Sequence, residues 1–269
     1  MTDPSSTGQR IRRSPEGILD GSQERIFRVL PESILGNMRS GDSEGSLLWN
    51  LIYPRAQPTI SLRRLLQTRP LWGSPAERVD DDLKPYYWGL SVEGERLPSF
   101  REALTAVAGR GDLLEIDLLL VGRAHVVVVE AKHGAAPGMC SRYQAGRCPE
   151  IHERSAGTCR YWEGDPAPFA STLSFGPRPA TGGDRPPCAD HYQLARCLLL
   201  ARELAGRLGL VPHLWLVIPS ARWRELQPLW LDFAERVTEE TDWRRLRVLP
   251  WEAIRDLDRS GGGALGSMR

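Results

Sequence analysis

Two short apolar runs near the middle of the chain have the pattern of paired strands. Residues 114–121 read LEIDLLLV and residues 125–131 read HVVVVEA, with Gly122 and Arg123 between them. Apolar and β-branched runs separated by a short turn are typical of a buried β-hairpin. A third run, 211–219 (VPHLWLVIP), predicts another buried strand.

Apolar residues at helical spacing predict two clear helices. The segment 41–55 has this spacing behind Ser43, a residue type that favours helix N-caps, and it ends near a proline. Residues 190–206 give the strongest helical pattern. Asp190 followed three residues later by Gln193 resembles a capping box, and a glycine closes the segment.

Weaker patterns complete the prediction. We expect helical turns in 62–66, a helix over 221–240 that is interrupted at Pro228, a short strand at 246–249 and a last helix at 251–257. The stretch 71–100 is expected to hold one strand, whose position the pattern does not fix.

The order of these elements predicts an α/β sandwich, in which helices flank a central mixed β-sheet. Residues 21–258 are expected to form a single domain, with flexible tails at 1–20 and in the glycine-rich segment 259–269. Residues 134–189, rich in Gly, Pro and Cys, are too long for an ordinary connection, so we interpret them as an insertion that is either functional or loosely ordered.

Composition narrows the class of protein. The 269 residues include 35 basic and 34 acidic side chains, a net charge of +1, and 41% are hydrophobic, as in ordinary globular proteins. This balance excludes a polybasic nucleic-acid coat, so any nucleic-acid surface must be local. The uncharged stretch 208–221 is too short for a membrane span and contains two prolines.

Two further features concern the compartment. The first residues show no apolar run followed by a cleavage site, and the five cysteines, an odd number, suit a reducing environment. The sequence therefore predicts a cytoplasmic protein that does not contact a membrane.

Three charged residues lie where a sheet should be apolar. Asp117 is inside the first strand of the predicted hairpin, and Glu130 and Lys132 lie at the end of the second. Glu130 and Lys132 share a face because side chains alternate along a strand. With a turn at residues 122–123, Asp117 lies opposite Val128, which puts all three charges on one face within a diagonal step.

This arrangement indicates a metal site. Two carboxylates about 4 Å apart repel by roughly 4 kcal/mol at an effective dielectric constant of ~20, so one would protonate unless a cation lay between them. Mg²⁺, with Mn²⁺ as the other candidate, binds carboxylates together with substrate phosphate and water. The ligands would be Asp117, Glu130 and the backbone carbonyl of Ala131, with Glu115 as a fallback.

Lys132 would orient or polarise an attacking water and offset the charge that builds on phosphorus. An arginine would serve less well because its pKa is too high for proton exchange. Only Lys84 and Lys132 are lysines among 35 basic residues, which points to a specific role for Lys132. The alternative is that Asp117 and Glu130 are solvated strand-end residues and Lys132 is their surface ion-pair partner.

Asp117, followed after twelve residues by Glu130-Ala131-Lys132, resembles the PD-(D/E)xK nuclease superfamily, whose members share the restriction-endonuclease-like fold. The core of that fold, a helix, a three-stranded meander, a helix and a further strand, is similar to the order predicted here. The resemblance implies that Asp117 and Glu130 hold the metal and that Lys132 is the catalytic lysine. It departs from the usual motif at Ile116, which stands in place of a proline.

The resemblance also implies roles for two residues outside the hairpin. Glu44 would match an acidic residue that completes the metal shell, and Gln193 would match a polar residue that some members direct at the site. A helix-dipole role explains Glu44 equally well, and a capping role is the favoured interpretation of Gln193.

The insertion raises the question of structural zinc, because Cys140, Cys148, His152 and Cys159 fall within 20 residues, with Cys188 further on. No C-x2-C pair is present, so scattered thiols are favoured over zinc. Cys197, on the apolar face of the predicted helix, is interpreted as a core residue.

Arginines and tryptophans alternate near the C-terminus in a pattern that suits a nucleic-acid surface, although a solvated helix face with buried tryptophans is favoured. They are Arg222, Trp223, Arg224, Trp230, Trp243, Arg244, Arg245 and Arg247.

The sequence thus predicts a Mg²⁺-dependent nuclease that acts on nucleic acid, DNA in preference to RNA. The competing hypothesis is a catalytically silent domain of the same fold that binds nucleic acid or a protein. Endonuclease and exonuclease action both stay open. A homodimer also stays open, because many enzymes that cut both strands are dimeric but no interface is evident in the sequence.

Overall fold

The computed structural model describes residues 19–38, 40–41, 43–56, 60–61, 64–65, 68–73, 82–109 and 116–258. Glu115 and most of the segments 1–20, 62–66 and 259–269 lie outside them, so these predictions are not addressed. Leu19 is buried, and the carbonyl of Asp20 accepts the indole N–H of Trp49 at 2.6 Å.

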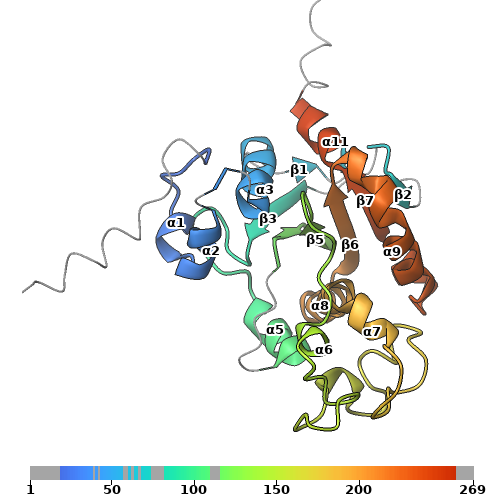
Figure 1. Ribbon diagram of the computed structural model, residues 1–269. Helices are drawn as coiled ribbons and strands as arrows, with labels where there is room; N and C mark the ends of the chain where they lie inside the picture. The colour runs from blue at the N-terminus through green and yellow to red at the C-terminus, as the bar shows by residue number, and fades with distance from the viewer. Residues whose placement is uncertain are drawn as a thin grey trace, which may run out of the picture.

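Seven strands of the described chain form one mixed sheet, in the order β1-β3-β4-β5-β6-β7-β2 (Figure 1). Their bounds are β1 (Ile60–Ser61), β2 (Trp72–Gly73), β3 (Asp82–Tyr87), β4 (Leu118–Val121), β5 (His125–Ala131), β6 (Val211–Ile218) and β7 (Leu246–Pro250). β3, β4 and β5 are antiparallel neighbours, whereas β5, β6 and β7 are parallel. The predicted α/β class with a central mixed sheet is confirmed.

Helices cover both faces of the sheet, with α5 and α8 on one side and α3 on the other (Figure 1). The α-helices are α1 (Ile26–Val29), α2 (Glu32–Asn37), α3 (Glu44–Ile52), α5 (Phe100–Ala108), α6 (Ser141–Gln144), α7 (Pro187–Asp190), α8 (Tyr192–Leu208), α9 (Trp223–Glu235), α10 (Glu240–Trp243) and α11 (Trp251–Arg255). Short 3₁₀ turns are η1 (Tyr53–Arg55), η2 (Arg160–Trp162), η3 (Ser220–Arg222) and η4 (Asp256–Asp258). Among the described helices, none combines the length and the apolar character that a membrane crossing needs.

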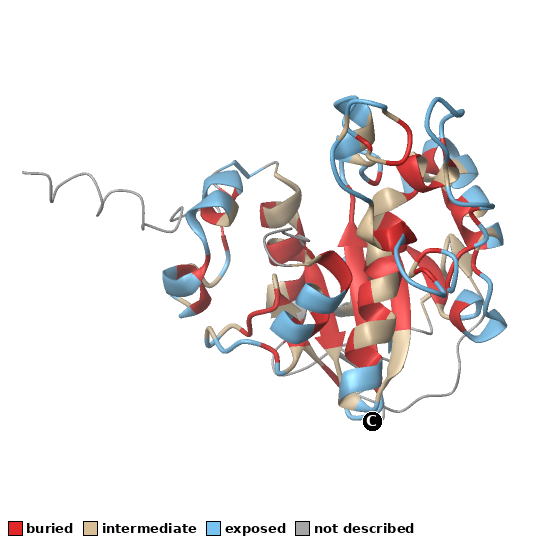
Figure 2. Ribbon diagram, turned by 90° about the horizontal axis from the view of Figure 1, so that it is seen from below, coloured by how far each residue is buried: buried red, intermediate tan, exposed pale blue. Residues whose placement is uncertain are grey.

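Alternation along the strands divides the core into two apolar layers. In β5, Val126 and Val128 pack on the side of α8, while Val127 and Val129 pack on the side of α3. Figure 2 shows the strands buried between the outer helices. Because both faces are covered, a strand in this position must be apolar at nearly every residue, and a charged residue there requires a specific partner.

The predicted hairpin is present, but its predicted register is wrong. The structure pairs Leu118 with Val129 and Val121 with Val126, two residues away from the predicted alignment. The reason is the turn: Gly122 N–H donates to the His125 carbonyl at 2.9 Å, so the chain reverses one residue later than expected. A register shift of two residues leaves every side chain on the same face of the sheet as predicted.

The predicted helices are present as α3, α8, α9 and α11, although α9 ends at Glu235, short of the predicted end at residue 240. Two further corrections concern particular residues. Ser43 caps α3 by accepting the N–H of Ser46 at 3.2 Å, as predicted. α9 is not interrupted at Pro228, because burial of Leu226 and Trp230 along one face holds the helix across the proline. The strong helix, α8, ends at Leu208 and not at the predicted glycine.

The insertion is a packed part of the fold. It contains buried aromatic rings in contact: Tyr161 and Phe169 are stacked with ring centres 4.6 Å apart, and Phe169 and Phe175 meet edge to face at 5.3 Å. These rings belong to the same apolar layer as α5 and α8. The aromatic residues of the insertion therefore contribute to the core.

Candidate active site

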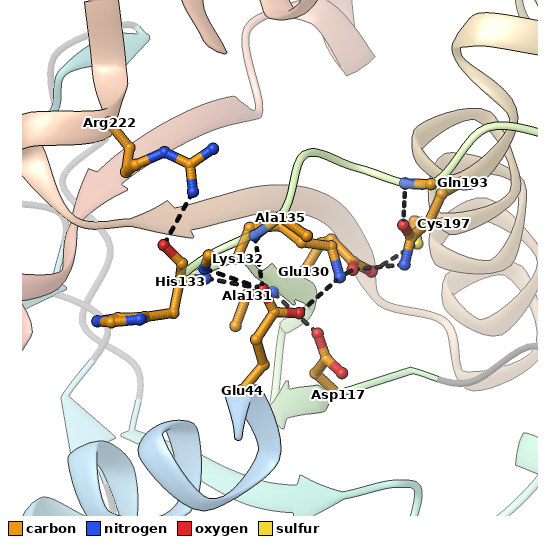
Figure 3. A network of polar contacts seen from close by, with 12 residues as sticks. Glu44, Asp117, Glu130, Ala131, Lys132, His133, Ala135, Gln193, Cys197 and Arg222 are labelled. Atoms are coloured by element: carbon orange, nitrogen blue, oxygen red, sulfur yellow. Dashed lines mark hydrogen bonds and ion pairs between the residues drawn. The ribbon is translucent and has the colours of Figure 1, made fainter. Parts of the chain in front are cut away.

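The three charged residues of the predicted motif meet at the carboxyl end of β5, between α3 and α8 (Figure 3). Glu130 and Ala131 are the last two residues of β5, and Lys132 follows directly. The N–H of Lys132 donates to the Val217 carbonyl of β6 at 2.9 Å, which fixes where the strand ends. The central position of β5 therefore places these side chains at the middle of the sheet.

Asp117 lies directly before β4 and faces the same spot. The observed register, continued one step beyond Leu118 and Val129, sets Asp117 opposite Glu130. Its Oδ2 accepts the N–H of Ala131 at 3.0 Å. Lys132 Nζ lies 2.7 Å from Glu130, so these contacts confirm the predicted convergence of the three residues. The charge of Asp117 also raises the pKa of Glu130 and of Lys132.

Glu130 is fully buried, with 0% of its surface exposed, and its carboxylate is held by three donors. Lys132 Nζ lies 2.7 Å from Oε1, Gln193 Nε2 donates to Oε1 at 2.5 Å, and Cys197 Sγ lies 3.5 Å from Oε2. Burial, followed by the charge of Asp117, raises the pKa of Glu130 to about 8, and Lys132 only partly offsets this. Burial and the charge of Asp117 therefore disfavour the ionised form of this carboxyl group.

Lys132 is the positive charge of the site. Its side chain is 11% exposed, and Nζ also lies 3.3 Å from Oε2 of Glu44. Burial lowers the pKa of Lys132, but the carboxylates of Glu130, Asp117 and Glu44 together outweigh it and raise the pKa. Lys132 is thus a protonated donor in this arrangement.

Glu44 reaches the site from the first turn of α3. Its Oε1 accepts three successive backbone N–H groups, from His133 at 2.9 Å, Gly134 at 3.4 Å and Ala135 at 3.3 Å. Burial raises the pKa of Glu44, but Lys132 and these backbone donors outweigh it, so the pKa is lowered. Glu44 therefore contacts Lys132 and the segment after β5, and its predicted part in a metal shell stays a prediction.

The interpretation of Gln193 as a capping residue is wrong. Its Nε2 donates to Glu130, and its Oε1 accepts the N–H of Gly138 in the insertion. The expected cap, Asp190, belongs to α7 and pairs with Arg185, and no side-chain bond caps α8 at His191. Because α7 contains Asp190 and α8 begins only at Tyr192, Gln193 does not take part in a capping box and its side chain can bind Glu130.

Two residues at the site were not predicted to be there. Cys197, correctly expected to be buried in the core, also contacts Glu130; its spacing of four from Gln193 could have indicated this, because such residues share a helix face. Arg222 donates from Nη1 to the His133 carbonyl at 3.0 Å and pairs with Glu225 at 2.8 Å. Arg222 thus supports the backbone that binds Glu44.

The other arginines and tryptophans near the C-terminus do not form one surface. Trp230 and Arg247 are buried, while Trp243 is exposed and Arg244 pairs with Glu240. The favoured interpretation, in which tryptophans turn to the core, holds for Trp230.

A cavity of about 340 Å³ opens beside the charged residues. Asp117, Lys132, Glu44 and Gln193 line it together with Trp88. Trp88 has a left-handed backbone (φ 50°), a conformation that costs free energy for a residue with a side chain and is concentrated at functional sites. The cavity gives a substrate access to the carboxylate of Asp117.

As their side chains lie, the described residues contain no group of three or more His, Cys, Asp or Glu that could hold a metal ion. The candidate site offers two carboxylates, those of Asp117 and Glu130, and the carbonyl of Ala131. Comparison of the chain with models of protein families, with curated proteins and with solved structures found no match.

Proposed function

We propose that the protein is a metal-dependent nuclease of the restriction-endonuclease-like fold, which hydrolyses phosphodiester bonds in nucleic acid, DNA in preference to RNA. The observation that carries the proposal is the meeting of Asp117, Glu130 and Lys132 at the end of β5, beside an open cavity. The order of strands from β3 to β6, with α3 before them and α8 between β5 and β6, supports the same proposal.

The donor set fits a hard divalent cation. Mg²⁺ is commonly held by one or two carboxylates while substrate phosphate and water complete its shell, so a protein site with two carboxylates is sufficient. The raised pKa of Glu130 supports the assignment, because burial and Asp117 disfavour the ionised form that a bound cation would favour. Asp117, Glu130 and the Ala131 carbonyl would hold Mg²⁺, or Mn²⁺. When bound, the ion would polarise the phosphoryl oxygen and lower the pKa of a water molecule.

The remaining chemistry is assigned to groups of the chain itself. Lys132 donates to the scissile phosphate or to the attacking water, and its charge offsets the negative charge of the transition state. Glu44 and Gln193 are positioning residues, because they fix Lys132 and Glu130 through direct hydrogen bonds. Trp88 lines the cavity and would supply an aromatic ring on which a base can stack, which favours nucleic acid over smaller phosphodiesters.

One observation favours the rival function, a catalytically silent domain that binds nucleic acid or a protein. Glu130 is sealed from solvent, and its oxygens are satisfied by Lys132, Gln193 and Cys197. A closed network of this kind is stable without a metal. The two hypotheses therefore differ in whether Mg²⁺ and Lys132 are required for a chemical step.

The test compares cleavage of supercoiled plasmid, linear duplex and single-stranded DNA, and RNA, in Mg²⁺, Mn²⁺ or EDTA. We expect cleavage that EDTA abolishes and added Mg²⁺ restores, with Lys132→Ala slower by about 100-fold or more because it loses a donor to the developing charge. The matched control is Lys84→Ala, which removes the other lysine of the chain, a half-exposed partner of Glu93. Cleavage that survives both EDTA and Lys132→Ala would exclude the proposed site.

A further inference from the structure

The insertion brings four of the five cysteines together, although their spacing in the sequence favoured scattered thiols. Cys140, Cys148 and Cys159 line the same surface pocket. The N–H of Cys140 donates to the carbonyl of Ala189 at 2.8 Å, which puts Cys140 beside the residue next to Cys188. Residues that are 48 positions apart in the sequence therefore share one site.

Each of these thiols is close enough to the other three for electrostatic interaction. Burial raises the pKa of Cys140, of Cys159 to about 11 and of Cys188 to about 12, and neighbouring cysteines of this group raise each pKa further. These interactions join every pair among Cys140, Cys148, Cys159 and Cys188. All five cysteines are free, so no disulfide accounts for the clustering.

Backbone N–H groups are directed at two of the sulfur atoms. Those of Arg142 and Tyr143 lower the pKa of Cys140, and that of Tyr161 lowers the pKa of Cys159. Donors of this kind stabilise a thiolate more than a thiol. The local backbone is thus arranged for sulfur atoms that carry negative charge.

The surroundings of the other two cysteines agree with this. The buried indole N–H of Trp162 has no close hydrogen-bond partner, and it acts on the thiol of Cys188 to lower its pKa. Nδ1 of His152 accepts the backbone N–H of Cys148 at 3.0 Å, so this nitrogen is already used in a hydrogen bond. The cluster therefore consists of four cysteines and does not use Nδ1 of His152.

We propose that Cys140, Cys148, Cys159 and Cys188 bind one structural Zn²⁺ ion. Four thiolates in a tetrahedral arrangement are a preferred ligand set for zinc, and such sites stabilise loops that have little core of their own. As they lie, the thiols are not yet grouped tightly enough to hold an ion. Binding draws the sulfur atoms to about 2.3 Å from the metal and releases the thiol protons to solvent, with no change of oxidation state.

The position of the centre gives it a structural consequence. Cys140 follows two residues after Gly138, whose N–H donates to Gln193, and Cys188 precedes Gln193 by five residues. The metal would therefore hold the two ends of the insertion against the start of α8. This inference does not depend on the proposed nuclease activity.

Metal analysis of the full chain, purified without chelators, tests the proposal. We expect one zinc ion per chain, lost in Cys140→Ser and Cys159→Ser and kept in Cys197→Ser, the matched cysteine control outside the cluster. A protein without zinc, iron with acid-labile sulfide in its place, or zinc retained in both cluster variants would overturn the assignment.

A measurement on the unsubstituted protein is needed because a misfolded cysteine variant would also lose zinc. Replacement of zinc by Co²⁺ is expected to give the intense visible absorption of tetrahedral cobalt bound to thiolates. Mass spectrometry after alkylation is expected to show all four cluster cysteines protected until a chelator is added. Octahedral cobalt spectra, or alkylation that the chelator does not change, would contradict the proposal.

Discussion

At the scale of single residues, three donors of different kinds hold the buried carboxylate of Glu130: an ammonium, an amide and a thiol. Both oxygens have protein partners, so the carboxylate cannot rotate without losing its contact with Lys132 or Gln193. Leaving a buried charge without its partner costs several kcal/mol. The site is therefore fixed in place before any substrate binds, which is what precise catalysis requires.

The Gln193→Glu substitution tests this arrangement. It replaces the donor that faces Glu130 with a second carboxylate, and two carboxylates at about 4 Å repel by roughly 4 kcal/mol at an effective dielectric constant of ~20. We expect a lower melting temperature and a DNA-cleavage rate at least about 100-fold lower in single-turnover assays. The same change at the exposed Gln227 of α9 controls for net charge. Wild-type behaviour of Gln193→Glu would contradict the contact with Glu130.

At the scale of elements, α3 and its cap determine where Glu44 points. The helix begins at Glu44, directly after Ser43, whose hydroxyl oxygen accepts the N–H of Ser46. Any fraying of this first turn moves Glu44 away from the three N–H groups after β5 and from Lys132. Stability of the helix end and geometry of the site are therefore coupled.

Ser43→Ala is expected to lower the free energy of unfolding by about 1 kcal/mol, because the N–H of Ser46 loses its acceptor. Cleavage should slow through disorder of Glu44, while Ser43→Asn, which keeps a capping oxygen, should behave like the wild type. Urea titration and single-turnover assays measure the two effects. If Ser43→Ala and Ser43→Asn are equally stable, the cap contributes nothing.

At the opposite end of β5 and β6, two buried histidines form a pair that makes the sheet sensitive to acid. His125 Nδ1 and His213 Nε2 lie 3.0 Å apart. Burial, then the charges of His125, Arg245 and Arg247, lowers the pKa of His213 from 6.5 to about 3. The folded protein thus binds fewer protons than the unfolded chain between these two values, so stability falls as the pH falls from 6.5 towards 3.

His213→Gln should remove part of this acid sensitivity. The comparison is between slopes of unfolding free energy against pH, because the substitution also changes packing and shifts the whole curve. Between pH 6.5 and pH 3 the unfolding free energy of the wild type should fall by about a few kcal/mol more than that of the variant. Parallel slopes from urea titrations would show that His213 does not titrate across this range.

Periodicity predicted the elements whose burial is regular. The strands β5 and β6 and the helices α3 and α8 follow from unbroken apolar patterns. α5 was not predicted, because its start at Phe100 follows a stretch of scattered Gly, Pro and aromatic residues and its preceding residue, Ser99, is left-handed and makes no side-chain cap. The hairpin register was misjudged for a local reason, the choice of turn residues, which contributes little to any apolar pattern.

The part of the candidate site that lies on the β4–β5 hairpin could be predicted from the sequence. Asp117, Glu130 and Lys132 follow from alternation, whereas a site role for Gln193 came only from the resemblance. Its contacts depend on where α7 ends and on Gly138, which lies 55 residues away in the sequence. The cysteine cluster was missed for a similar reason. Its members are irregularly spaced in the sequence, and only the folded insertion brings them together.

At the scale of the whole molecule, the insertion connects the candidate active site with the cysteine cluster. The backbone N–H groups of residues 133–135, where the insertion begins, bind Glu44, and that of Gly138 binds Gln193 before the chain reaches Cys140. The two sites prefer different metals, since carboxylate oxygens select hard ions and thiolates select soft ones. A hard cation added to the protein should therefore act on the carboxylates and leave the thiols unchanged.

Binding of Ca²⁺ can be measured without DNA cleavage. It tests whether a cation reduces the repulsion between Asp117 and Glu130, on which the proposed function depends. Protein freed of Mg²⁺ by gel filtration should gain stability on addition of Ca²⁺, about 2.7 kcal/mol when Ca²⁺ is at 100 times its Kd, because only the folded chain holds Asp117 and Glu130 together. Asp117→Asn removes one of the two charges, so its melting temperature should respond less. Asp184→Asn, an exposed position in the insertion, should respond like the wild type. An equal response of all three proteins in thermal denaturation would place the Ca²⁺ elsewhere and remove the physical reason for a metal between these two carboxylates.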